Sequence, residues 1–227
     1  MSKSSKRYTT AKAKVTAGQT YSLEEGIKLV KETATVKFDS TVEIHVKLGI
    51  DAKKSDQGVR ATVSLPHGTG KIQRVVAFVS PDKEKEAKDA GADLYGGKDL
   101  IEKIKTSGKI EFDVAVATPD IMRDLSAIAK ILGQKGLMPN PKVGTVTTNI
   151  KQTVEEIKKG RAAFKNDDSA NVHLLIGKVS FTDEQLKENI IAFLDALKRM
   201  KPEGAKGTFI KNVHLASAMG PGIKIQF

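Results

Sequence analysis

The stretch from residue 132 to residue 145 has the composition of a phosphate-contacting loop. It holds three glycines, two prolines and two lysines, Lys135 and Lys142, and it has no acidic residue. Glycines such as Gly133 and Gly136 can adopt positive φ and leave backbone N–H groups uncovered, and the prolines stiffen the chain. Lysines and free N–H groups are common partners of phosphate oxygens. We therefore expect a rigid basic contact loop; the alternative is an ordered connection between two helices.

A second glycine-rich stretch, residues 66–71, is similar to the end of a nucleotide-binding P-loop. That motif requires a glycine five residues before Gly70 and a serine or threonine after Lys71. The sequence has Leu65 and Ile72 at these positions. The pattern therefore excludes a P-loop and favours a hinge that contains Gly68 and Gly70.

Catalysis and metal binding have no comparable support. The four histidines, His45, His67, His173 and His214, are far apart in the sequence, and none has the HExxH spacing of a zinc site. The chain has no cysteine, which rules out disulfides and thiolate ligands. Most acidic residues lie on predicted helix faces, paired with lysines four positions away, as on a solvated surface. We expect no metal, no cofactor and no enzymatic activity.

The charge balance indicates a polyanionic partner. Lysine and arginine number 38 against 27 acidic residues, which gives a net charge of +11. Nucleic acid explains this excess best and an anionic membrane second. No apolar run approaches 18 residues and the N-terminus lacks the apolar core of a secretion signal, so we expect a cytoplasmic protein without a membrane span.

Two further features concern the way in which nucleic acid is bound. Residues 1–14 contain five basic residues and no acid, which predicts an arm that is disordered until it meets RNA, or else a solubilising tail. Aromatic residues make up only 5% of the chain, and tryptophan is absent. With few aromatic side chains on which bases could stack, the chain is unlike a protein that binds single strands. The composition favours recognition of folded RNA by its shape and 2′-hydroxyls.

The elements that position these residues follow two patterns. Capping boxes begin helices at Ser22 and Thr182, and in residues 41–48 apolar side chains alternate with Thr41, Glu43, His45 and Lys47. Continuous apolar runs at 75–79 and 114–117 predict strands covered on both faces. We expect helices at 22–33, 82–90, 98–106, 118–133, 149–160 and 182–201, and strands at 38–48, 60–65, 75–79, 92–95, 114–117, 172–179, 208–216 and 223–227.

The change of pattern along the chain predicts an α/β protein with two domains. Residues 1–68 and 160–227 would form one discontinuous α/β sandwich domain, and residues 69–159 an inserted Rossmann-like domain with a mostly parallel sheet. Glycine hinges at Gly68, Gly70 and Gly160 would join them. The flanking segments carry 22 basic and 14 acidic residues and the insertion 16 and 13, so the terminal domain should provide more of the RNA electrostatics.

Several motifs in order resemble one known family, that of ribosomal protein L-one, in its bacterial form. They are Lys37-Phe38-Asp39 with Thr41-Val42-Glu43, Ser64-Leu65-Pro66-His67-Gly68, Ala90-Gly91-Ala92-Asp93, Ala117-Thr118-Pro119-Asp120, the stretch 132–146, Phe164-Lys165-Asn166-Asp167, the stretch 201–207 and Met219-Gly220-Pro221. The resemblance covers nearly the whole chain. It implies the same insertion of a Rossmann-like domain into a two-segment α/β domain.

The resemblance also implies a function. Members of this family bind large-subunit rRNA at the mobile stalk, assist release of exit-site tRNA and repress their own operon by binding its mRNA. We also expect the free protein to be a monomer. Carried over by position, the RNA contacts are Phe38, Thr41, Glu43, Lys47, Lys165, Asp167, Met219 and Gly220. We expect Lys37 and Ser217 to contact RNA beside them. Lys135, Gly136 and Lys142 would make secondary contacts to RNA or tRNA.

Two of these positions need comment. Many relatives have threonine before the Met-Gly pair, whereas this chain has Ala218, so a hydroxyl contact is lost unless Ser217 replaces it. Glu43 would repel phosphate, and it should therefore accept a hydrogen bond from a 2′-hydroxyl or a base amine. Its alternative role is an ion pair with Lys37 or Lys47.

Two other functions compete with RNA binding. A nucleotide-using enzyme on the parallel sheet is one, although such sheets also occur in many proteins that are not enzymes. A general anion-binding or membrane-surface module is the other, and the lack of a basic amphipathic helix disfavours it.

Overall fold

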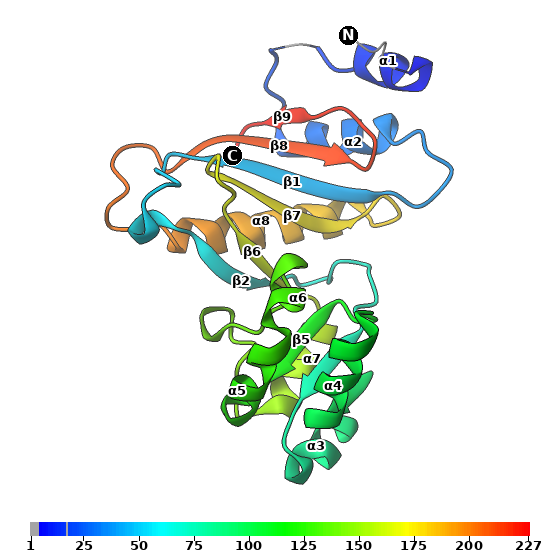
Figure 1. Ribbon diagram of the computed structural model, residues 1–227. Coiled ribbons are helices and arrows are strands. Elements are labelled where there is room, and N and C mark those ends of the chain that lie inside the picture. The colour runs from blue at the N-terminus through cyan, green and yellow to red at the C-terminus, as the bar shows by residue number, and fades with distance from the viewer. Residues whose placement is uncertain (1–4, 17) are drawn as a thin grey trace. The chain divides into compact units, whose positions relative to one another are not determined.

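The computed structural model describes residues 5–16 and 18–227, and these form two compact units (Figure 1). The terminal unit comprises Met1–Lys71 with Ala162–Phe227, and the inserted unit comprises Ile72–Arg161. Both combine helices with β-sheet, which confirms the predicted α/β class.

The terminal unit is built on an antiparallel sheet in the strand order β7-β1-β8-β9. Helices α2 and α8 pack on one face of this sheet (Figure 1). The bounds of these elements are β1 (Thr41–Leu48), β7 (Asn171–Lys178), β8 (Ile210–Ser217), β9 (Ile223–Ile225), α2 (Leu23–Thr33) and α8 (Asp183–Arg199).

Local sequence rules explain the main elements of this unit. Ser22 and Thr182 each accept a hydrogen bond from the third helical residue, and Glu25 and Gln185 return it, so both capping boxes are confirmed. In β1, residues at even positions such as Ile44 are buried and residues at odd positions are half-buried, as the alternation predicts. The buried side chains pack against apolar residues of α2 and α8. The other face of the sheet therefore keeps the polar side chains.

A small second sheet in the terminal unit was not expected. It pairs β2 (Arg60–Ser64) with β6 (Arg161–Lys165), and a short 3-10 helix, η1 (Ser55–Gln57), precedes β2. Strand β6 is short and begins and ends with a basic residue, so it lacks a strong pattern of its own. Phe164 of β6 packs edge-on against Phe193 of α8, with ring centroids 5.3 Å apart.

The basic arm is partly helical, which corrects the expectation of disorder. Helix α1 (Lys6–Ala13) begins at Ser5, whose hydroxyl accepts a hydrogen bond from the N–H of Tyr8. Ala11 is buried and Arg7 donates to the Met219 carbonyl at 3.1 Å, so tertiary contacts hold this helix. Residues 1–4 of the arm lie outside the described residues.

The inserted unit contains a parallel sheet in the order β4-β3-β5. Alternate strand residues enter two separate hydrophobic clusters, one with Phe78 and the other with Ala77, so both faces are covered as predicted. The bounds are β3 (Val75–Phe78), β4 (Leu94–Gly96), β5 (Val114–Ala117), η2 (Pro81–Lys83), α3 (Glu84–Asp89), α4 (Lys98–Ser107) and α7 (Ile150–Lys158).

The helix expected up to Gly133 is broken into short pieces. These are η3 (Pro119–Ile121), α5 (Met122–Leu125), η4 (Ser126–Ile128) and α6 (Ala129–Gln134). Thr118 does not cap this segment, because its side chain is fully buried and makes no hydrogen bond to the first turn. Gly133 lies inside α6 instead of ending it.

The proposed hinge glycines are held more firmly than the sequence suggests. Gly68 and Gly70 have φ of 65° and 70°, a conformation that favours glycine. The Asn189 side chain donates to the Gly68 carbonyl, and a Cβ on Gly70 would lie 3.0 Å from the Phe181 ring. Both glycines thus belong to the terminal unit, and the chain enters the inserted unit only after Lys71. Gly160, with φ of 111°, follows the end of α7.

Candidate nucleic-acid interface

The open face is the side of the four-stranded sheet opposite α2 and α8. Thr41, Glu43, His45 and Lys47 of β1 lie on it and are half-buried. Their neighbours across the sheet come from β7 and β8. The part of the chain that precedes the insertion and the part that follows it therefore contribute to one polar surface.

At the Lys47 end, the loop between β6 and β7 is organised by Asp167. Its carboxylate accepts hydrogen bonds from the backbone N–H groups of Asn171 at 2.7 Å and Ser169 at 2.9 Å. These bonds, first that of Asn171, lower the pKa of Asp167 to about 2. The Lys47 ammonium donates to the Ser169 carbonyl, which joins this loop to β1. Lys165, at the end of β6, is exposed.

At the Thr41 end, the loop after β8 presents a strained residue. Met219 has a φ of 63° and an exposed side chain, and such backbone strain often occurs at functional sites. The Ala218 N–H donates to the Thr41 carbonyl at 2.9 Å, which fixes the loop to β1. The Gly220 N–H donates to the Ser217 carbonyl at 2.8 Å and closes the turn.

Ser217 does not lie on the open face, contrary to expectation. It is the last residue of β8 and continues the strand alternation, so its side chain points to the helix-covered side and the residue is only 4% exposed. Among the described residues, its hydroxyl has no hydrogen-bond partner. A Cβ on Gly220 would lie 2.3 Å from this hydroxyl. Ser217 therefore shapes the turn under Gly220 and does not supply the hydroxyl that Ala218 lacks.

The segment before β1 places two predicted residues in solvent. Lys37 is exposed, and Phe38 exposes 58% of its surface. Asp39 anchors the segment, because its carboxylate accepts from the Ser180 N–H at 3.1 Å and hydroxyl at 2.9 Å. An exposed phenylalanine beside an anchored turn is available to pack on a partner.

Glu43 has neighbours other than the two lysines considered from the sequence. Its carboxylate accepts a long hydrogen bond of 3.4 Å from the Thr41 hydroxyl and lies 3.8 Å from Nε2 of His45. Its side chain remains 42% exposed. Part of the carboxylate is therefore free to accept a hydrogen bond from a ligand.

The Gly/Pro loop of the inserted unit is closed on itself. The backbone N–H groups of Gly136, Leu137, Asn140, Val143, Gly144 and Thr145 all donate within the loop or to Leu132 and Gly133. This contradicts the expectation of uncovered N–H groups, and of the glycines it contains only Gly136 and Gly144 have positive φ. Lys135 is exposed, whereas the Lys142 side chain lies outside what the structure describes.

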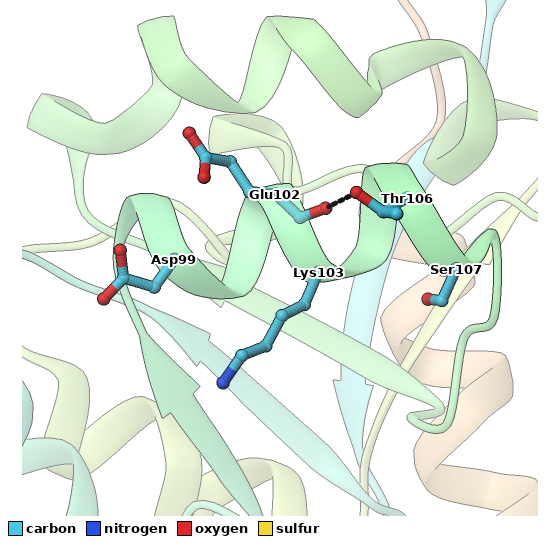
Figure 2. Close-up of a pocket in the computed structure, with 5 residues that line it drawn as sticks. All are labelled: Asp99, Glu102, Lys103, Thr106 and Ser107. Atoms are coloured by element: carbon cyan, nitrogen blue, oxygen red, sulfur yellow. Dashed lines mark hydrogen bonds between the residues drawn. The ribbon is translucent and has the colours of Figure 1, made fainter.

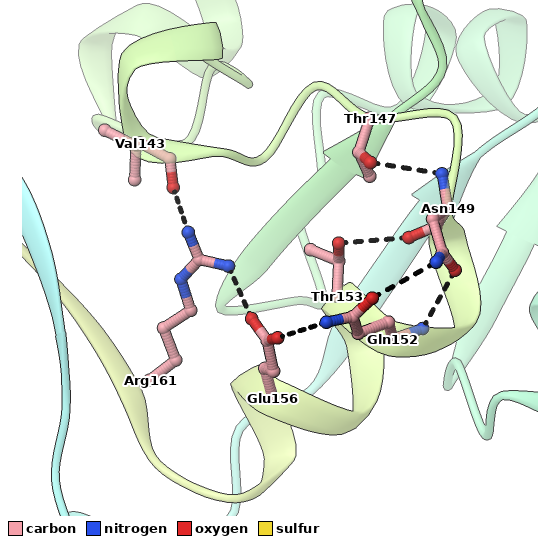
Figure 3. A network of polar contacts seen from close by, with 7 residues as sticks. All are labelled: Val143, Thr147, Asn149, Gln152, Thr153, Glu156 and Arg161. Carbon is pink, nitrogen blue, oxygen red and sulfur yellow. Dashed lines mark hydrogen bonds and ion pairs between the residues drawn. The ribbon is translucent and has the colours of Figure 1, made fainter.

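A polar network ties this loop to helix α7 (Figure 3). Arg161 donates to the Val143 carbonyl at 3.0 Å and to Glu156 at 2.7 Å, and Glu156 accepts from Gln152 at 3.0 Å. A Cβ on Gly144 would lie 2.5 Å from the Arg161 guanidinium, and the φ of 71° at this position favours glycine. The loop is thus held by its own hydrogen bonds and by Arg161, and its side chains, not its backbone N–H groups, are available to a partner.

Two hollows of the inserted unit do not suit a nucleotide. A cavity of about 300 Å³ lies where β3, β4 and β5 end, which is where such sheets bind ligands. Its charged lining is mainly acidic, namely Glu84, Asp99, Asp120 and Asp124, and Lys98 lies 3.7 Å from Asp124. These carboxylates would repel phosphates, which argues against the enzyme hypothesis.

A second hollow runs along the surface of α4 (Figure 2). All five residues that line it, among them Asp99, Glu102 and Lys103, belong to this one helix. Thr106 donates to the carbonyl of Glu102 within the same helix. This hollow is open, and its side chains come from one helix and include both acidic and basic groups. They do not surround a position where a ligand could bind.

Two searches of the described residues bear on the remaining alternatives. In residues 5–16 and 18–227, no three His, Asp or Glu side chains are grouped so as to hold a metal ion. In the same part of the chain, no helix is both long and apolar enough to cross a membrane.

The sequence interpretation missed two histidines of the open face. His173 and His214 lie directly opposite His45 on either side of β1. Each occupies a polar position in a strand with alternating polarity, and this pattern could have placed both histidines on the open face. Their alignment with His45 depends on the strand register, which cannot be read from the sequence.

Comparison with known proteins identifies the chain's relatives. Residues 30–221 match the ribosomal protein L1p/L10e family. The chain is 52% identical over 226 residues to "Large ribosomal subunit protein uL1" of Mesoplasma florum, covering 100% of this chain and 99% of that protein. It is 51% identical to the proteins of the same name from Thermosipho africanus and Thermus thermophilus, over 99% of this chain and 97% and 98% of theirs. The chain therefore belongs to the ribosomal protein L1p/L10e family, as a bacterial uL1 protein of the large ribosomal subunit and not an enzyme.

Proposed function

We propose that the terminal unit binds large-subunit rRNA at the mobile stalk through the open face and the two loops at its ends. The observation that carries this proposal is that two loops far apart in the sequence are both attached to β1. The loop with Asp167 and the loop with Met219 both join β1, through Lys47 and Thr41 respectively. One continuous surface thereby unites segments that are far apart in the sequence.

The chemistry of this surface suits folded RNA. The terminal unit has 22 basic and 14 acidic residues, and its excess of positive charge favours phosphate contacts. Exposed Lys37 and Lys165 are available for phosphates, while Glu43 can accept from a 2′-hydroxyl or base amine. Phe38 and Met219 offer exposed apolar surface for sugars and bases. Mixed charge of this kind would give selectivity for RNA shape as well as affinity.

The further roles that we propose follow from binding of rRNA by the terminal unit. A protein fixed to the stalk by its terminal unit could present the loop of the inserted unit, with Lys135 and Lys142, to exit-site tRNA. A similar fold in the mRNA of its own operon would compete for the same open face and so permit repression of translation. Both roles belong to the cytoplasmic ribosome and require no cofactor.

The test is binding of the full chain to a stalk RNA fragment over a series of salt concentrations. We expect the logarithm of the affinity to fall linearly with the logarithm of the salt concentration, by about 0.9 for each phosphate neutralised in a duplex. An unrelated RNA duplex of the same length is the control and should bind more weakly at every salt concentration. Equal affinity for the two RNAs would refute specific recognition.

A further inference from the structure

Three histidines and a lysine form a row across the open face. His173 of β7 pairs with His45 of β1, His45 pairs with His214 of β8, and His214 pairs with Lys224 of β9. This histidine row crosses all four strands of the sheet. It lies between the Met219 loop and the Asp167 loop, within the surface that we propose for RNA.

Two members of the row are joined directly. The Nδ1 atoms of His45 and His173 are 2.7 Å apart, and the rings meet edge to face with centroids separated by 5.0 Å. The outer nitrogen of each ring faces a carboxylate: Nε2 of His45 lies 3.8 Å from Glu43, and Nε2 of His173 lies 3.5 Å from Asp167. The four side chains therefore form a chain of carboxylate, imidazole, imidazole and carboxylate.

Counting protons shows what this chain of groups can hold. Two neutral imidazoles have two N–H groups, but three places in the chain favour one: the gap between the rings and the two nitrogens that face carboxylates. One additional proton satisfies all three places. A second would put N–H groups on both facing Nδ1 atoms and break the bond between the rings. The His45–His173 pair is thus a site for one extra proton.

The groups around the pair determine its charge in the free protein. Glu43 and Lys47 flank His45 on β1, Asp167 faces His173, and His214 and Lys224 follow on β8 and β9. Burial, followed by the charge of His173, lowers the pKa of His45 below its usual value. Burial also lowers the pKa of His214, with Lys224 as the second cause. The free protein should therefore hold His45 and His214 mainly as neutral imidazoles at pH 7.5.

We propose that the histidine row is a further RNA-contacting element and that the His45–His173 pair takes up one proton when RNA binds. This inference rests on the proposed function, because RNA phosphates supply the negative potential that stabilises the imidazolium form. The additional charge also offsets Glu43 and Asp167, so these carboxylates can face RNA as acceptors at a lower electrostatic cost.

The direction of the pH effect follows from linkage. If RNA raises the pKa of the pair, the gain in affinity is complete below the pKa of the free protein and is lost as the pH rises above that of the complex. A rise of one unit corresponds to about tenfold in affinity. Binding should therefore be tighter at pH 6 than at pH 8 at constant ionic strength.

The experiment is calorimetric titration of the full chain with the stalk RNA fragment at pH 6.5, in two buffers that differ in ionisation enthalpy. The difference in measured heat gives the number of protons taken up. We expect uptake by the wild type and by the control His67→Gln, since His67 pairs with Glu188 of α8 at 2.6 Å, away from the open face. The double variant His45→Gln/His173→Gln should lose most of the uptake and bind RNA more weakly.

A second measurement on the wild type avoids any question about folding of the variants. NMR titration of the histidine ring protons, with and without RNA, should show raised pKa values for His45 or His173 and an unchanged value for His67. Full RNA binding without proton uptake, or uptake that persists in the double variant, would overturn this inference and leave the proposed function intact. Failure of the wild type to bind stalk RNA at both pH 6 and pH 8 would overturn the proposed function as well.

Discussion

The terminal unit leaves one face of its sheet open, whereas the inserted unit covers both faces of its own. The open face displays the polar half of an alternating pattern, with Glu43, His45 and Lys47 half-buried side by side. In the inserted unit, all four residues of β3 are buried. A sheet that is covered on both sides can offer only its edges and strand ends to a ligand.

The charges follow the same division. The terminal unit has most of the basic excess, and the cavity at the strand ends of the inserted unit is mainly acidic. The comparison shows why a parallel sheet with a cavity at the usual place is a poor guide to function here. Surface chemistry favours the open sheet as the RNA-binding surface that we propose.

Truncating one core residue in each unit should have the largest effect. Phe193 and Phe78 are both fully buried, and each packs edge-on against a second phenylalanine. Phe193→Ala and Phe78→Ala should each lower the free energy of unfolding of their own unit by about 3–5 kcal/mol. Urea unfolding followed by hydrogen exchange would measure this. RNA affinity should fall only for Phe193→Ala; an equal fall for Phe78→Ala would mean that the RNA surface depends on both units.

The variant Gly220→Ala adds a methyl group to the Met219 loop and tests whether the Thr41 end of the open face contributes to RNA affinity. In Gly220→Ala the new Cβ would lie 2.3 Å from the Ser217 hydroxyl and 3.2 Å from its carbonyl oxygen, so the Ser217 side chain or the turn must shift. We expect about a 10- to 100-fold loss of affinity for stalk RNA, the scale of one to two good contacts. The matched control is Gly222→Ala, where a Cβ meets nothing within 4 Å. Equal effects of the two changes would show that the shape of this turn does not matter.

Removing a negative charge from the open face should weaken binding, against the simple electrostatic expectation. Glu43→Ala removes the acceptor proposed for a 2′-hydroxyl or base amine, and we expect about a tenfold loss of affinity for stalk RNA. Glu24→Ala changes the net charge equally, but Glu24 pairs with Lys187 between α2 and α8. Filter binding of both variants to stalk RNA and to an unrelated duplex would compare them. Tighter binding of Glu43→Ala to every RNA would eliminate Glu43 as a contact.

The smallest expected effect is the response of the Asp167 loop to acid. The pKa of Asp167 is lowered to about 2, mainly by the N–H of Asn171, whereas an unfolded aspartate titrates near 3.9. The ionised carboxylate therefore stabilises the folded state above about pH 4, and this contribution is lost as the pH falls towards 2. Asp167→Asn should be less stable than the wild type at pH 6, with a difference that shrinks in acid. Denaturant unfolding at several pH values measures the trend, and a constant difference would contradict it.

The sequence by itself determined what depends on neighbours a few residues apart. The capping boxes at Ser22 and Thr182 need only a side chain and the residue three positions later, and both were predicted correctly. The alternation in residues 41–48 and the apolar runs at 75–79 and 114–117 distinguish an open sheet from a covered one, because burial follows the strand period. Family membership followed from motifs in order, since it depends on residue identity alone.

Tertiary structure decided what depends on pairing between distant segments. Strand β6 exists because β2, about one hundred residues earlier, pairs with it. Ser217 turned inward because β8 runs one residue further than the sequence indicates, and one residue reverses the face on which a strand side chain lies. Only the register of β7, β1 and β8 brings His173, His45 and His214 into one row. The sequence determines which residues each strand contains, but hydrogen bonds between the strands determine which side chains lie next to one another.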